Sequence, residues 1–135
     1  MPAPSQYVYA TPAVVAANTS FLDLVDAGAN AGKIELYAED DTLLAEVLLG
    51  TANAKPSGVV DSGTGTLTFT IDGPDTSANN SGTCTYGVIT DTAGTILLSI
   101  PTVAGAAPVQ GYLVLNSTSI VAGSQVTVVS AVIGA

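Results

Sequence analysis

Hydrophobic and polar residues alternate with a period of two in several stretches of this chain. The clearest case is the stretch 66–71, where Leu67, Phe69 and Ile71 fall on one face and threonines on the other. Such alternation, or a short apolar run between turn residues, predicts a strand. Strands are predicted at 33–37, 43–49, 66–71, 83–90, 95–100, 112–115 and 125–133.

Turn residues separate these segments. The acidic run 39–42 and the sequence Asp72-Gly73-Pro74-Asp75 are typical turns, and residues 91–94 read as a hairpin. Seven to eight short strands joined in this way predict a mainly β fold, a single β-sandwich of which the jelly roll is one form. The last strand, 125–133, is apolar on both faces, so it is either central and covered or part of an interface.

The N-terminal part follows another pattern. Prolines interrupt residues 1–17, which predicts an extended arm ahead of a β-sandwich domain at 18–135. A short helix is predicted at about 20–28. Its signals are a polar cap at 18–20, an apolar stripe at Phe21, Leu22, Leu24 and Val25, and Gly28 near its end.

Composition excludes several functions. The 135 residues include 11 acids and two lysines but no arginine or histidine, giving a net charge of -9. The chain has no cluster of basic residues with which to bind nucleic-acid phosphates. Catalytic triads that depend on histidine cannot form. One cysteine without histidine cannot build the usual zinc site. We therefore expect no enzyme, no cofactor and no metal, and no membrane span because no apolar run is long enough.

The position of the charges is more informative than their number. The first charged residue is Asp23 and the last is Asp91, so residues 92–135 carry no charge. Interfaces are depleted of charge at their cores, which favours contact with other protein subunits. The alternative is a core-rich end of the domain whose exposed side happens to be polar and uncharged.

Two acidic turns offer oxygen ligands for calcium, at Glu39-Asp40-Asp41 and at Asp72 and Asp75. Neither has the spacing of an EF-hand loop, and aspartate is common in turns for backbone reasons. Aromatic residues make up only 5% of the chain and tryptophan is missing. This weakens the hypothesis of a carbohydrate-binding module, because such modules usually stack sugars on aromatic rings. A sugar-binding β-sandwich module, with Tyr112 as a contact, remains an alternative.

Candidate interface residues come from the arm and the uncharged C-terminal part. Tyr7 and Tyr9 would point the same way on an extended arm and could anchor it on a neighbour, although two unengaged terminal tyrosines are the equal alternative. The full set of candidates is Tyr7, Tyr9, Val14, Val15, Tyr112, Val129 and Ile133.

An ordered set of motifs resembles a known family. It consists of Leu22-Asp23, DAGANAGKIELY (26–37), LLAEV (43–47), SANNSGTCTY (77–86), ITDTAGT (89–95) and LNSTSIVAG (115–123). Over residues 20–133 this order is similar to small structural proteins of tailed bacteriophages that are regarded as capsid decoration, or cement, proteins. The chain departs from the family at Tyr86 and Val88, where members often have Trp and Arg, and in the added segment 1–17.

The resemblance implies a β-sandwich on the virion surface, made in the cytoplasm of a bacterial host. Its partners would be the major capsid protein, whose neighbouring capsomers it bridges, and further copies of itself, with a trimer favoured over a dimer. A tail, baseplate or adaptor protein of the same fold is the nearest alternative. The sequence does not separate these locations, because all of them need uncharged contact surface and no active site.

Overall fold

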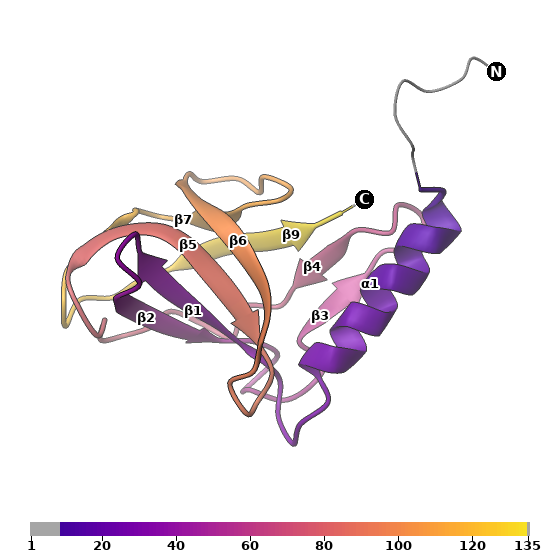
Figure 1. Ribbon diagram of the computed structural model, residues 1–135, viewed down its shortest axis with the longest axis horizontal. Coiled ribbons are helices and arrows are strands. Elements are labelled where there is room, and N and C mark those ends of the chain that lie inside the picture. Colours follow the sequence, from indigo (N-terminus) through magenta and orange to yellow (C-terminus); the bar gives the residue numbers. More distant parts are fainter. Residues whose placement is uncertain (1–8, 135) are drawn as a thin grey trace, which may run out of the picture.

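The computed structural model describes residues 9–134, and these form the mainly β fold that the sequence predicts (Figure 1). One helix packs beside nine strands. The elements are α1 (Thr11–Val25), β1 (Lys33–Ala38), β2 (Leu43–Leu48), β3 (Gly58–Val60), β4 (Leu67–Phe69), β5 (Gly82–Thr90), β6 (Ile96–Ala104), β7 (Leu113–Leu115), β8 (Ser119–Ile120) and β9 (Val128–Ile133).

The strands belong to one sheet that curls into a sandwich-like half-barrel. Its order is β2-β1-β5-β6-β7-β9-β4-β3, with β8 paired to β5. All pairs are antiparallel except β6 and β7, which run parallel. Because the sheet curls, apolar side chains from distant strands meet in one core. Its largest fully buried members are Ile34, Leu36, Leu44, Leu49, Leu67, Ile89, Leu113 and Leu115.

Every predicted strand overlaps an observed one. The turn at 39–42 closes with Ala38 N–H donating to the Thr42 carbonyl, and the hairpin at 91–94 joins β5 to β6 with Gly94 at a φ of 89°. The sequence missed β3 and β8, which have only three and two residues, and the extension of β6 through Pro101 to Ala104. Strand β9 lies between β7 and β4, so the apolar C-terminal strand is central in the sheet.

The helix prediction was wrong about where the helix starts. Helix α1 begins at Thr11, so residues 11–17 are helical and do not belong to an extended arm. Pro12 sits in the first turn, where its missing N–H has no helical partner to lose. The segment 18–20 that was expected to cap the helix lies inside it. The helix ends at Val25, three residues before the predicted end.

Helix α1 is fixed to the β3–β4 end of the sheet by specific contacts. The Asn18 side-chain amide donates a 2.6 Å hydrogen bond to the Gly65 carbonyl, and the ring of Phe21 meets that of Phe69 edge to face. Beyond the helix, the Asp26 carboxylate accepts hydrogen bonds from the backbone and hydroxyl of buried Ser57. These contacts hold the helix as part of the domain.

Candidate interaction surface

An uncharged row of side chains crosses the sheet from β3 to the start of β7. Strand register places Val59 beside Thr68, and Thr68 beside Val132. Gly111 N–H donates to the Val132 carbonyl, which sets Tyr112 next to Val132, and Tyr112 N–H donates to the Val109 carbonyl. We call Val59, Thr68, Val132, Tyr112 and Val109 the uncharged row.

Most of this row is accessible. Val59 is 63% exposed and Tyr112 is 40% exposed, and Thr68 and Val109 are also on the surface. The row exists because alternate residues of a strand point to opposite faces, so that Leu67 and Phe69 fill the core while Thr68 points outward. The four apolar members lie on the outside of the sheet, where they cannot contribute to the core.

The loop between β6 and β7 continues the same surface. Residues 105–112 are exposed and contain no charged side chain. Gly105 N–H donates to the Leu115 carbonyl, and a Cβ on Gly105 would lie 3.4 Å from Val114. The loop therefore begins beside β7, next to fully buried Val114. Its own outer side adds further uncharged surface beside the row.

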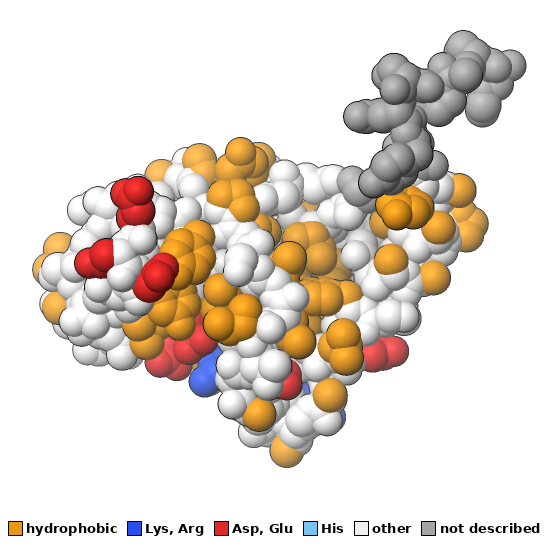
Figure 2. Space-filling view, viewed as in Figure 1, with side chains coloured by type: hydrophobic (Ala, Val, Ile, Leu, Met, Phe, Trp, Pro, Cys, Tyr) orange, Lys and Arg blue, Asp and Glu red, His pale blue; other side chains and the backbone are white. Residues whose placement is uncertain are grey.

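Five of the eleven acidic residues gather elsewhere. Figure 2 shows acidic side chains over the end of the molecule formed by β1 and β2, whereas the surface over β6 and β7 has none. We call the five acids of this region the acidic end. A 3.8 Å ion pair joins Lys33 to one of them. The members are Glu35, Glu39, Asp40, Asp41 and Glu46.

Two stacked tyrosines lie at the acidic end. The rings of Tyr37 and Tyr86 are nearly parallel, with centroids 5.3 Å apart, so each ring covers one face of the other. The Tyr86 hydroxyl donates a 2.6 Å hydrogen bond to Asp41, and this bond, with smaller contributions from desolvation and the Asp41 charge, raises the pKa of Tyr86 to about 12. Burial, followed by the Glu35 charge, raises the pKa of Tyr37.

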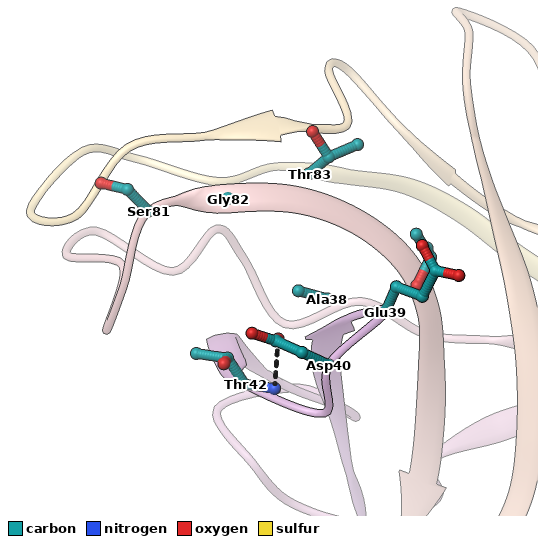
Figure 3. Close-up of a pocket in the computed structure, with 8 residues that line it drawn as sticks. Ala38, Glu39, Asp40, Thr42, Ser81, Gly82 and Thr83 are labelled. Carbon is teal, nitrogen blue, oxygen red and sulfur yellow. Dashed lines mark hydrogen bonds between the residues drawn. The ribbon is translucent and has the colours of Figure 1, made fainter.

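A shallow depression of about 400 Å³ is lined by residues that include Ala38 and Thr85, the sequence neighbours of these tyrosines. Figure 3 shows that the carboxylates of Glu39 and Asp40 at its rim point in different directions. Asp40 accepts a hydrogen bond from Thr42, and the Thr42 side chain and backbone hold the pKa of Asp40 below its ordinary value. The depression therefore brings no pair of carboxylates together.

The acidic turn at 72–75 serves the backbone. The Asp72 carboxylate accepts hydrogen bonds from the N–H groups of Ala52 and Asn53, and the Asp75 carboxylate accepts them from Glu46 and Ser77. Within residues 9–134, no group of three or more Asp, Glu, Cys or His side chains is placed to hold a metal ion. The chemistry of the turn is that of Asx-type capping.

The structure separates the predicted interface residues into groups. Tyr9 is exposed just before α1, where it lines a groove with Val14 and the C-terminal Gly134. Tyr112 belongs to the uncharged row, and Val129 is 36% exposed on β9. Val15 is half-buried on α1, and Ile133 packs against the core. Tyr7 lies outside the described residues.

One of these predictions needs correction. Val14 is only 5% exposed, because the helix turns it towards Gly65, where a Cβ would come within 2.6 Å of its side chain. Val14 is a core residue and is not available to a partner. The sequence prediction failed here because residues 11–17 were assigned to an extended arm.

The sequence prediction also missed most of the uncharged row. Val59 was not a candidate because β3 was not predicted. Val132 was not a candidate because its outward position on the sheet becomes clear only from its pairing with Thr68. The candidate Tyr112 and the absence of charge from residues 92–135 were the signals of this surface in the sequence.

Comparison with known proteins adds no relative: no family model, no curated protein and no solved structure matches this chain.

No helix in the described part of the chain is long and apolar enough to cross a membrane.

Proposed function

We propose that this chain is a structural protein of a tailed-phage virion, a decoration protein that binds the outside of the coat-protein shell. It attaches through the uncharged row and the adjoining 105–112 loop, and it bridges neighbouring capsomers as a homo-oligomer. The proposal also places its synthesis in the cytoplasm of a bacterial host, where the shell assembles.

One observation carries this proposal: an exposed, uncharged row crosses a small protein of net charge -9. Surfaces that remain in water normally carry interspersed charge, and contact surfaces lose it at their centres. The sequence resemblance supplies the identity of the partner. The acidic end would then face solvent and keep the particle soluble.

Such a protein needs no strong single contact. On a shell with closed symmetry the same contact recurs many times, and copies that are linked to one another bind with added avidity. A row of four apolar side chains and one threonine is small for an isolated stable complex. It is sufficient for a contact that is repeated over a lattice.

Copy number in the virion tests the location. Quantitative mass spectrometry of purified virions should give a ratio to the major coat protein near one, or a simple fraction of it. A dozen copies or fewer would instead place the protein in the tail, the baseplate or an adaptor. Its absence from the virion would overturn the proposal and return attention to a sugar-binding module.

A matched pair of substitutions tests the surface. Thr68→Lys puts a charge in the middle of the uncharged row, whereas Thr85→Lys puts the same charge on an exposed strand position beside the acidic depression. We expect T68K to lose binding to shells that lack this protein and T85K to keep it, measured by co-sedimentation. Equal binding of the two variants would show that attachment uses another surface.

A further inference from the structure

Strand β6 has an open side along most of its length. It pairs with β5 from Ile96 to Pro101, but on its other side it pairs with β7 only from Thr102 to Ala104. Residues 96–101 therefore have no strand on that second side within residues 9–134. In any strand, the backbone groups of alternate residues point to opposite edges, so this side presents unpaired hydrogen-bonding groups.

The outer edge of β2, by contrast, is covered by the chain itself. The carbonyls of Leu44 and Leu48 accept hydrogen bonds from Asn79 and Asp72, and Glu46 N–H donates to the Asp75 carboxylate. The edge strand β3 is only three residues long. Natural proteins protect exposed strand edges by such covering or by short length. The open side of β6 is neither covered nor short. Two further kinds of edge protection, a β-bulge and a proline, occur near the two ends of the exposed segment, at Leu97 and Pro101.

The surroundings of this edge are uncharged and mix apolar with polar groups. A groove of about 400 Å³ runs along it, and Ile96 at its start is 56% exposed. The nearest charged residue in the sequence is Asp91, since no charge occurs from residue 92 onward. The groove is lined by Leu98, Ser99, Ile100, Pro101, Gln110, Gly111, Ile133 and Gly134.

We propose that two copies of this chain join through β6, whose residues 98–100 pair antiparallel with the same residues of the second copy. Two chains of charge -9 repel each other wherever their acids meet, and this edge lets their backbones approach with no acid between them. Antiparallel self-pairing also forms a closed twofold contact, the commonest symmetry of protein dimers.

Pro101 limits the paired segment. It lies opposite Tyr86 in the β5–β6 ladder and has no N–H to give to either neighbour, so pairing ends before it. The bulge at Leu97 limits the segment at its other end, so its centre is Ser99, and Leu98 of each copy lies opposite Ile100 of the other. This twofold contact goes beyond the proposed attachment to a shell, and it differs from the trimer that the sequence resemblance implies.

The test uses the full chain and two matched aspartates. Ser99→Asp places a charge on the paired segment close to its twofold axis, and Thr68→Asp adds the same charge at an exposed strand position of the uncharged row. In sedimentation velocity over a range of concentrations, the wild type should be a dimer. We expect S99D to raise the dimer Kd by roughly tenfold or more, because like charges meet across the axis, and T68D to leave it unchanged.

Amide hydrogen exchange locates the contact independently of any variant. Exchange in residues 98–100 should slow as the wild-type concentration rises through the dimer Kd. The proposal is overturned by a wild type that stays monomeric or forms trimers, by equal effects of S99D and T68D, or by slow exchange in β6 that is independent of concentration. The last result would mean that the edge is already covered within one chain. None of these outcomes tests whether the protein attaches to a shell, because the copy number in the virion tests that proposal separately.

Discussion

At the scale of single residues, the most specific polar contact on the surface joins two strands and a turn. Tyr86 on β5 stacks on Tyr37 of β1, and its hydroxyl donates a hydrogen bond to Asp41 in the turn that follows β1. Asp41 adopts a φ of 66°, and aspartate in a turn adopts such a positive φ more readily than most other residues. The contact ties the acidic turn to the sheet.

This contact makes the ionisation of Tyr86 a measurable signal. The carboxylate stabilises the neutral phenol, which raises the pKa from its ordinary 10.0 to about 12. We expect Asp41→Asn to bring the Tyr86 pKa back towards 10, followed by the absorbance of the phenolate during an alkaline titration. Asp40→Asn is the matched control, because Asp40 bonds to Thr42, and it should leave the titration unchanged.

The sign of the effect on stability follows from the same shift. Since the folded-state pKa of Tyr86 is raised, the contact stabilises the fold fully below about pH 10 and loses this contribution as the pH rises through about 12. A wild-type protein whose stability advantage over D41N persisted above that range would contradict this assignment of the bond.

At the scale of elements, the sequence predicted strands well and the helix poorly, for physical reasons. Strand alternation is local, so Leu67 and Phe69 could be assigned to the core from the sequence alone, and both are buried. The helix stripe is interrupted by Asn18, which is buried because its amide bonds to Gly65, 47 residues away. No local pattern contains that partner. The apolar stripe was therefore placed too late, and it included Leu24, which is 57% exposed.

The observed position of helix α1 leads to a prediction about two of its side chains. Val14, which the sequence placed in an arm, should matter more for stability than the larger Leu24, which the sequence placed in the apolar stripe of the helix. We expect Val14→Ala to lower the free energy of unfolding by about 1.5–3 kcal/mol, from lost burial and a residual cavity. Leu24→Ala should change it by less than about 0.5 kcal/mol. Urea denaturation of both variants measures the difference, and the reverse order would mean that the helix packs through its other face.

The end of α1 offers a second test of how the helix is held. The Asp26 carboxylate accepts hydrogen bonds from the backbone and hydroxyl of fully buried Ser57, whose hydroxyl oxygen in turn accepts one from Gly32 N–H. Removing the carboxylate leaves buried donors without their partner.

We therefore expect Asp26→Ala to cost about 1–3 kcal/mol in the free energy of unfolding, measured by urea denaturation. Asp23→Ala, which removes an exposed carboxylate from the same helix, is the control and should cost less than about 0.5 kcal/mol. Equal losses in the two variants would show that the Asp26–Ser57 contact contributes nothing specific.

At the scale of the whole molecule, the sequence predicted that an uncharged surface exists but did not predict which residues form it. The absence of charge after Asp91 could be read directly. The row itself combines Val59 and Thr68 from the charged half of the sequence with Val109, Tyr112 and Val132 from the uncharged half. Its members become neighbours only through the pairing of β4 with β9, whose residues lie more than sixty positions apart. Long-range pairing of this kind leaves no local signal.

This separation of charge predicts how attachment to a shell should respond to salt. Charged contacts weaken as the screening length falls from about 10 Å at 0.1 M salt to about 3 Å at 1 M, whereas apolar contacts do not. We expect the affinity of the wild type for stripped shells to change by less than about threefold over this range, measured by co-sedimentation. Thr85→Lys, which alters only the acidic end, should behave like the wild type. A steep loss of affinity with salt in the wild type would instead mean that the acidic end makes the contact, with a basic patch on the shell as its partner.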